Sequence, residues 1–234
     1  MRACEWAEIM WFKKSPVVVT DQDLYELRES AQGLALRLKD LGYTTPAYSM
    51  DNRPLPENFR ERLEELKIFS KLVNELVCEN PGTKGHKDLL WKYLSYKKFA
   101  PTSDVLDKIS DDDCIEVYDM DGNQMFRSLN CFSLMSFSVE DLVSLNWKRA
   151  FRRSAKVTLG LLELVLRFAT GYFRTTYDCA KVPVHIVEET SAKRNKIRLR
   201  FRYIAPLRQG GKCIAMLVVT NAKLLTSGPY GDAA

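Results

Sequence analysis

Apolar residues in the N-terminal half of the chain recur at helical spacing and predict a first helix between Thr20 and Gly42. Thr20 and Asp23 form a capping box at its start, and Gly42 is suited to end it. The apolar positions are separated alternately by three and four residues: Leu24, Leu27, Ala31, Leu34, Leu38 and Leu41. This narrow seam fits one partner helix, and it is short for a free-standing coiled coil. We therefore expect a helix that packs within its own domain.

Further helices are predicted before residue 110. The segment from Glu57 to Glu79 carries an apolar face and ends before a Pro-Gly pair, and the segment from Lys87 to Phe99 is rich in aromatic residues. Ser103 is placed to cap a last short helix that ends at Ile109. We therefore interpret residues 1–110 as an α-helical region.

The pattern changes after residue 110 to short apolar runs separated by turns. An apolar run at Ile115–Tyr118 and another at Gln124–Arg127 flank the turn Asp119–Gly122, which is typical of a tight hairpin. A short helix is predicted next, and Ser138 with Asp141 reads as a second capping box.

The remaining segments predict a helix followed by strands. Trp147–Phe151 is expected to continue into an apolar helix at Leu159–Phe168, and strands are expected at Tyr172–Asp178 and Val182–Glu188. Lys196–Ile204 alternates between an apolar and a basic face. The apolar face carries Ile197, Leu199, Phe201 and Tyr203, and the basic face carries Arg198, Arg200 and Arg202.

The last predicted strand, Cys213–Val219, is apolar on both faces. A strand of this kind needs cover on both sides of its sheet. The candidates for the outer cover are the N-terminal helices and a second copy of the protein, and we expect both near this surface.

The order of elements from Asp121 to Leu142 resembles the opening of a PAS domain. PAS sequences commonly read Asp-Gly, then an aromatic residue and Asn, then a short helix and a Ser-x-Glu-Glu-Leu segment. Here Asp121-Gly122, Phe126 and Ser128 stand at the first positions, and the run from Leu134 to Leu142 stands at the second. The segment from Ala205 to Val219 is similar to the family's final hairpin. Each motif alone is short, and the resemblance rests on their order and spacing.

This resemblance implies an α+β fold: a PAS-like five-stranded antiparallel sheet with flanking helices at residues 111–225, followed by a flexible tail at 226–234. PAS domains bind small molecules between the sheet and the helices, and many use the outer sheet face to dimerise. By this resemblance the candidate pocket residues are aromatic, Met or Leu side chains: Phe126, Phe132, Met135, Trp147, Phe151, Leu162, Tyr177 and Tyr203. The alternative is that these side chains simply fill the core.

The resemblance does not identify a cofactor. Haem is not expected, because His86 lies outside the PAS-like region and His185 lies on a predicted strand. Flavin is not expected either, because Asn130-Cys131-Phe132 lacks the Arg of the light-sensing motif. No metal site is expected, since the acidic residues from Asp111 to Asp121 lack the spacing of a calcium loop.

The charge is unevenly distributed. Residues 1–110 carry 17 basic and 17 acidic residues, so the whole excess of +5 lies in the C-terminal half. Candidate partner-binding residues are the arginines of two basic segments: Arg149, Arg152, Arg153, Arg198, Arg200 and Arg202. With Lys148 and Lys156, the first group is expected on about two helical turns. We favour an acidic protein partner; nucleic acid is the alternative, but a net charge of +5 is mild.

No arrangement typical of catalysis is evident: there is no phosphate-binding glycine loop, no metal-ligand spacing and no nucleophile with a His partner. No apolar run is long enough to span a membrane, no signal peptide is recognisable, and the scattered cysteines indicate a reducing compartment. We therefore expect a non-enzymatic, cytoplasmic signalling protein that forms a homodimer and contacts a signalling partner. A pure scaffold and a DNA-contacting transcriptional regulator are the alternatives.

Overall fold

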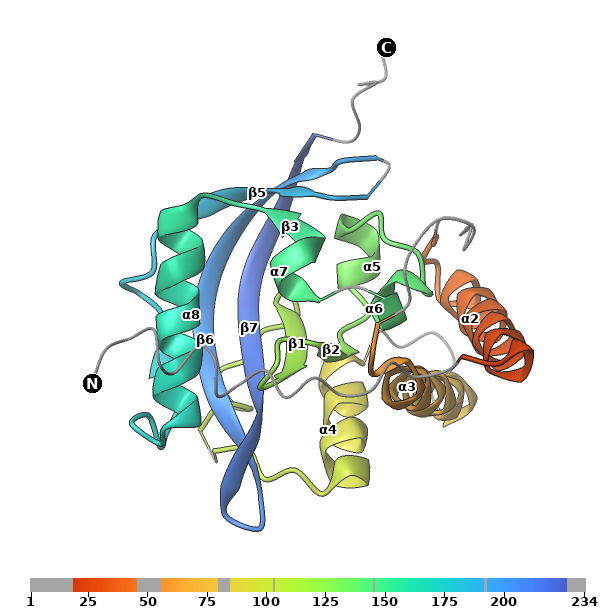
Figure 1. The fold of residues 1–234 in the computed structure, drawn as a ribbon, viewed down its shortest axis with the longest axis horizontal. Coiled ribbons are helices and arrows are strands. Elements are labelled where there is room, and N and C mark those ends of the chain that lie inside the picture. Colours follow the sequence, from red (N-terminus) through yellow and green to blue (C-terminus); the bar gives the residue numbers. More distant parts are fainter. Residues whose placement is uncertain are drawn as a thin grey trace.

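The structure is a computed structural model, and it describes residues 19–45, 56–79, 85–102, 104–144, 146–191 and 193–226. Three long helices precede a curled antiparallel sheet (Figure 1). The cap predicted at Ser103 and all but the first residue of the predicted tail lie outside the described residues. None of the described helices is both long and apolar enough to cross a bilayer.

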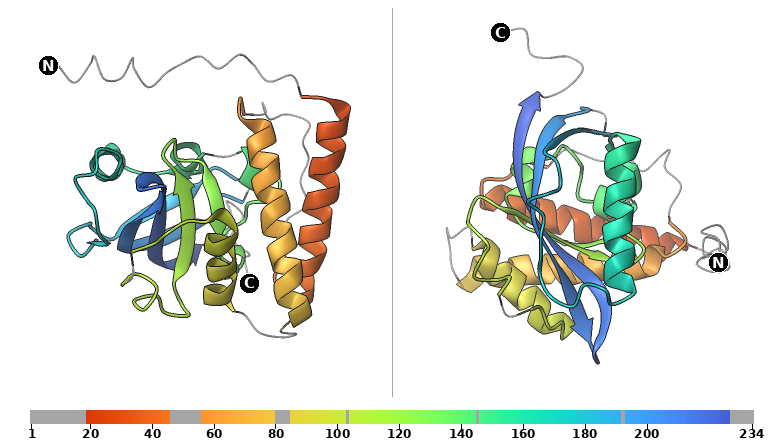
Figure 2. Two further views of the ribbon diagram at one scale, coloured as in Figure 1. Left: turned by 90° about the horizontal axis from the view of Figure 1, so that it is seen from below. Right: turned by 90° about the vertical axis from the view of Figure 1, so that its left-hand side faces the viewer.

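The first two helices form a parallel pair, in which Asp23 meets Arg60 near one end and Arg37 meets Asn74 near the other. Helix α2 (Asp21–Asp40) begins with the predicted capping box, in which the Asp23 backbone N–H donates to Thr20 Oγ1 over 3.2 Å. Its apolar seam packs on helix α3 (Phe59–Glu79), and the two helices lie side by side in Figure 2. The partner helix predicted for the narrow seam is therefore α3.

Helix α3 also joins the helices to the sheet. Its buried Arg62 donates to the backbone carbonyls of Gln124 and Val143, the second over 3.3 Å, while Phe69 packs edge to face on Phe126 at 5.7 Å between ring centroids. Strand β2 (Gln124–Arg127) is thereby held against α3.

The sheet contains seven strands, two more than expected, and its main path runs β2-β1-β7-β6-β5-β3, with β4 paired to β6. The longest strands are β6 (Lys196–Gln209) and β7 (Lys212–Thr226), which pair along most of their length. Strand β1 (Cys114–Asp119) lies between β2 and β7. The two shortest strands, β3 (Phe151–Arg152) and β4 (Tyr177–Asp178), have two residues each, and β5 spans His185–Glu189.

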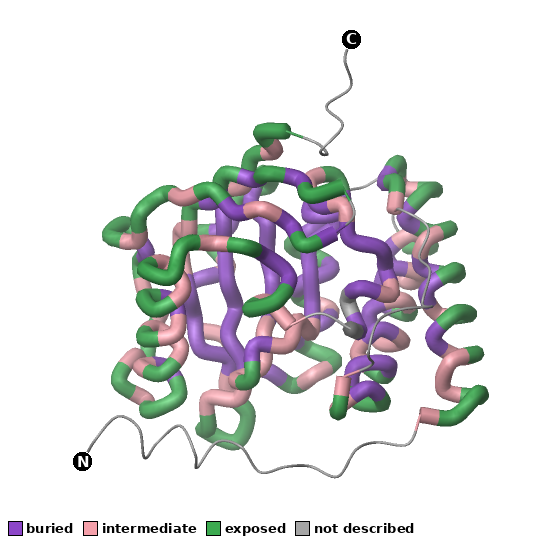
Figure 3. Tube along the Cα trace, turned by 45° about the horizontal axis from the view of Figure 1, so that its top comes forward, coloured by how far each residue is buried: buried purple, intermediate pink, exposed green. Residues whose placement is uncertain are grey.

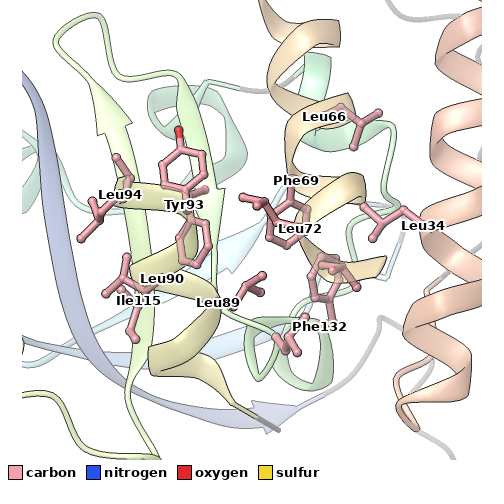
Figure 4. Packing of buried hydrophobic residues seen from close by; sticks show 14 of the residues in the cluster. Leu34, Leu66, Phe69, Leu72, Leu89, Leu90, Tyr93, Leu94, Ile115 and Phe132 are labelled. Carbon is pink, nitrogen blue, oxygen red and sulfur yellow. The ribbon is translucent and has the colours of Figure 1, made fainter. Parts of the chain in front are cut away.

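Helix α4 (His86–Lys97) covers the outer face of the sheet. Its Leu89, Leu90 and Tyr93 belong to one buried cluster with Ile115 of β1 and with Leu217 of β7 (Figure 4). The prediction that the last strand needs a cover on its outer face is confirmed, and the N-terminal helices provide it. This cluster contains residues from both sides of position 110.

The inner face of the sheet is covered by shorter elements and one long helix. These are α5 (Cys131–Leu134), α7 (Trp147–Ala150) and α8 (Ala155–Ala169), while α6 (Asp141–Ser144) packs against α3. The predicted capping box precedes α6, because the Asp141 N–H donates to Ser138 Oγ over 3.2 Å. The buried positions follow the sheet between these two helical layers (Figure 3).

A bulge in β6 overturns the predicted alternation of that strand. Phe201 pairs with Thr220, whereas Tyr203 pairs with Val219, so Arg202 is the extra residue. An extra residue reverses which side chains face each side. Phe201 and Ile204 consequently face inward, while Tyr203 packs with the outer cluster.

Three local expectations are wrong. The segment from Trp147 does not continue as one helix, because α7 ends at Ala150 and β3 separates it from α8. The strand expected at Tyr172–Asp178 is reduced to β4, and the residues from Asp104 to Lys108 form turns in place of a helix.

Candidate ligand pocket and its buried polar groups

A cavity of about 60 Å³ lies between the inner face of the sheet and α8. Most of its wall is apolar: α8 contributes Leu161 and Val165, β6 contributes Phe201 and Ile204, and β7 contributes Met216 and Val218. A cavity needs roughly 10–15 Å³ to hold one water by this measure. The space therefore corresponds to about four to six waters.

Helix α8 is loosely packed for so apolar a helix. Of its 15 residues only Leu161 and Phe168 are buried, while Leu159 and Leu166 are 66% and 55% exposed. Phe168 fixes the C-terminal end by packing against Phe173, at 5.2 Å between ring centroids. The helix thus has a firm end and a long portion that lies over the cavity.

Arg153 is the cationic group in the cavity wall, just before α8. Its guanidinium lies over the rings of Trp147 and Phe151, at 4.9 Å and 5.4 Å from their centroids. Its Nε is buried and has no hydrogen-bond partner among the described residues. Burial lowers the pKa of Arg153, and Tyr118 and Glu116 act in the opposite direction. An arginine keeps its charge under these conditions, so the cavity wall carries a cation with an unused donor.

The β1–β2 hairpin positions Trp147. Asp119 accepts hydrogen bonds from the backbone N–H groups of Asp121 and Asn123, over 3.0 Å and 2.7 Å, as the predicted turn requires. Gly122 has φ +87°, and its carbonyl accepts from the Trp147 N–H over 3.1 Å. A Cβ at Gly122 would collide with the indole ring. The turn glycine therefore leaves the space in which the indole lies.

A buried ion pair lies on the same side of the sheet. Glu116 and Arg127 are opposite each other in the hairpin, with Oε1 and Nη2 at 3.8 Å, and both are less than 10% exposed. Gln124 donates to Glu116 and, over 3.3 Å, to the hydroxyl of Tyr118. Arg127 Nε and Nη1 are buried without a hydrogen-bond partner in the described residues. The one carboxylate in the cavity wall, Glu116, is thus already engaged by two side chains.

His185 lies beside the cavity. Its ring stacks on Phe201 with centroids 5.6 Å apart and an interplanar angle of 14°. Its Nδ1 lies 3.0 Å from the carbonyl oxygen of Pro183 and donates to it, while Nε2 is buried without a partner among the described residues. Burial lowers the pKa of His185, the hydrogen bond to the Pro183 carbonyl acts in the opposite direction, and the positive charge of Arg153 adds a smaller lowering.

The structure brings together three of the eight predicted pocket residues. Met135, Trp147 and Phe151 line the cavity. On α8, Leu161 and Val165 line it, and Leu162 does not, so the predicted helix face was displaced by one residue.

The other four predicted pocket residues lie elsewhere. Phe126 and Phe132 pack in the core shared with α3, and Tyr203 is turned to the outer face by the β6 bulge. Tyr177 packs against Phe173, at 4.7 Å between ring centroids.

The predicted basic surface is divided. Arg149, Arg152, Arg198 and Arg200 are exposed, and Arg152 forms an ion pair with Glu188 at 3.6 Å. Arg202 is paired with Asp113 and donates to Ser110 Oγ over 3.0 Å, so it holds the loop before β1. Arg153 belongs to the cavity wall.

The sequence contained a signal for two residues that the prediction missed. Glu116 interrupts an apolar run, and the hairpin register that follows from the turn places Arg127 opposite it. A charge inside each of two paired strands indicates a buried pair. His185 and Phe201 had no comparable signal, because their stacking depends on the register of β5 and β6.

Comparison with known proteins adds no relatives: no family model matches the sequence, and no curated protein is significantly similar to it.

Proposed function

We propose that this chain is a PAS-like sensory or interaction protein, non-enzymatic and cytoplasmic, that binds a small molecule between its sheet and α8. The observation that carries the proposal is Arg153: its buried Nε has no hydrogen-bond partner among the described residues, and it lies in a mostly apolar cavity wall. A buried polar atom without a partner is costly, and ligand sites combine apolar walls with a few such groups. The order of elements supports the PAS-like assignment, since a hairpin, short helices and α8 are followed by strands that return to pair with β1.

The size of the cavity determines how a bound ligand acts on α8. A ligand larger than about four to six waters fills the space beneath α8 and presses on the helix. We propose that such a ligand displaces the exposed portion of α8 while the end near Phe168 stays anchored. Displacement of a weakly held helix by a ligand is a change that a partner protein can read.

The same strands connect the cavity to the N-terminal helices. Met216 and Val218 face the cavity, and Leu217 between them packs in the cluster that contains α4. A shift in β7 on the cavity side therefore acts directly on the packing of the outer helices. We propose this route as the output of the protein.

The proposal is tested by native mass spectrometry of the purified full chain beside a denatured sample. We expect added mass on the native protein that disappears on denaturation, and the same spectrum tests the proposed homodimer. A native mass equal to that of the bare chain would contradict the occupied-sensor proposal and favour the pure scaffold.

An acidic protein partner is the second element of the proposal. Arg198 and Arg200 are exposed on β6, and Arg198 pairs in register with the exposed Lys223 of β7. The rival is a transcriptional regulator that contacts DNA. A salt-sensitive mobility shift with duplex DNA, lost in the double variant Arg198→Ala/Arg200→Ala, would favour that rival.

A further inference from the structure

The polar groups at the cavity indicate which class of molecule it takes. Arg153 lines the cavity directly, and His185 stacks on Phe201, another lining residue. Each of these two side chains has a buried nitrogen without a hydrogen-bond partner, Nε of Arg153 and Nε2 of His185. The two residues come from neighbouring strands, because Arg152, which precedes Arg153, pairs with Glu188 of β5, and β5 begins at His185. One unused nitrogen therefore lies in the cavity wall and the other lies beside it, next to Phe201.

We propose that the cavity binds an amphipathic monocarboxylate, with its acid group between Arg153 and His185 and its apolar body against Phe201, Leu161 and Val165. This inference rests on the proposed function and specifies the ligand of that same site.

The charge of the wall favours an anion. Arg153 is cationic, and the nearby carboxylate of Glu116 already faces Arg127 and accepts from Gln124. A neutral ligand would give Arg153 no charge partner beyond the nearby Glu116 and the two rings beneath its guanidinium, and a cation would add repulsion. A carboxylate supplies a charge-assisted hydrogen bond to Nε, which is about twice as strong as a neutral one.

His185 suits a carboxyl group in particular. Its Nδ1–H is committed to the Pro183 carbonyl, so Nε2 is the nitrogen that remains for a ligand. A carboxyl group forms a hydrogen bond with Nε2 through a single proton, which is carried either by the carboxyl oxygen or by the nitrogen. The part of the wall formed by α8 and the adjoining part of β6 is apolar, with Leu161, Val165 and Ile204. This leaves a carbon body, and not a second charged group, as the other end of the molecule.

The test uses octanoate as the probe and octanol as its neutral match, titrated into the full chain by calorimetry. The indole N–H signal of Trp147 in a heteronuclear spectrum locates binding at the cavity. We expect octanoate to bind at least about tenfold more tightly than octanol and to shift the Trp147 signal, since a hydrogen bond to a charged group exceeds the energy of a tenfold change.

Arg153→Met keeps an apolar stem and removes the charge, and it should abolish the preference for octanoate. Arg152→Met is the matched control: it alters the adjacent arginine, which is exposed and paired with Glu188, and it should leave both affinities unchanged. If Arg153→Met does not fold, Arg153→Lys replaces it; it keeps a cation without the guanidinium Nε and should bind octanoate several-fold more weakly. His185→Phe preserves the stacking on Phe201 and should weaken octanoate by about fivefold, the size of one ordinary hydrogen bond.

Octanol that binds as tightly as octanoate, or an Arg153 variant that binds octanoate as the native protein does, would overturn the inference. In that case the Trp147 signal still moves, and the proposed ligand-binding function stands. If neither probe binds or moves that signal, both the inference and the proposed function fail.

Discussion

Replacing Gly122 by alanine tests whether the hairpin turn and the cavity wall are built as one unit. Gly122 has φ +87°, and a Cβ there would meet the indole of Trp147. A left-handed conformation costs an L-residue about 1–2 kcal/mol, and forcing extra atoms into a packed site adds about 1–3 kcal/mol. We therefore expect Gly122→Ala to lower the free energy of unfolding by about 2–5 kcal/mol.

Gly211→Ala is the matched control. Gly211 also lies in a hairpin turn, with φ +81°, but a Cβ there would meet no atom within 4 Å. It should cost only the backbone contribution of about 1–2 kcal/mol. Urea unfolding followed by circular dichroism measures both variants, and the indole N–H signal of Trp147 in a heteronuclear spectrum should shift only in Gly122→Ala. Equal costs for the two variants would refute the claim that Gly122 makes room for the indole.

Three further predictions concern the fold. Phe126→Ala should cost about 3–5 kcal/mol and leave one unfolding transition, because Phe126 packs on both α3 and α4; separate transitions for the helices and the sheet would contradict a shared core. Among the described cysteines, Cys78 is exposed, whereas burial raises the pKa of Cys179 to about 12. A thiol reagent should therefore label Cys78 in the native protein and Cys179 only after unfolding. Fast labelling of Cys179 in the native protein would count against the structure. Hydrogen bonds from the backbone and side chain of Thr20 lower the pKa of Asp23 from 3.8 to about 2, so its contribution to stability is present above pH 3.8 and lost as the pH falls through about 2. The stability difference between the native protein and Asp23→Asn should accordingly shrink between pH 4 and pH 2, and a difference that stays constant would exclude the capping carboxylate as its source.

Local patterns predicted those elements whose chemistry is contained in a few adjacent residues. The Thr20–Asp23 box, the Ser138–Asp141 box and the turn at Asp119–Gly122 each depend on hydrogen bonds within four residues, and all three form as expected. The cover over β7 was also predictable, because an apolar strand on both faces demands it.

Features that depend on register were not predictable in the same way. The bulge at Arg202 changes which side of β6 faces inward, and nothing in the alternation from Ile197 to Tyr203 indicates where the pairing shifts. On α8 nearly every position is apolar, so periodicity did not distinguish Leu161 from Leu162 as the cavity residue. The break after Ala150 separates residues that looked like one basic helix face, and it places Arg153 in the cavity wall.

The central claim is that the cavity beneath α8 takes a ligand and that α8 responds. Hydrogen exchange of the full chain, followed by mass spectrometry with and without saturating octanoate, tests it most directly. We expect slower hydrogen exchange in α8, because its cavity-facing side gains contacts with octanoate. We expect unchanged exchange in α2, which packs on the far side of α3. Identical exchange in α8 with and without the probe, at concentrations where calorimetry detects binding, would contradict the account.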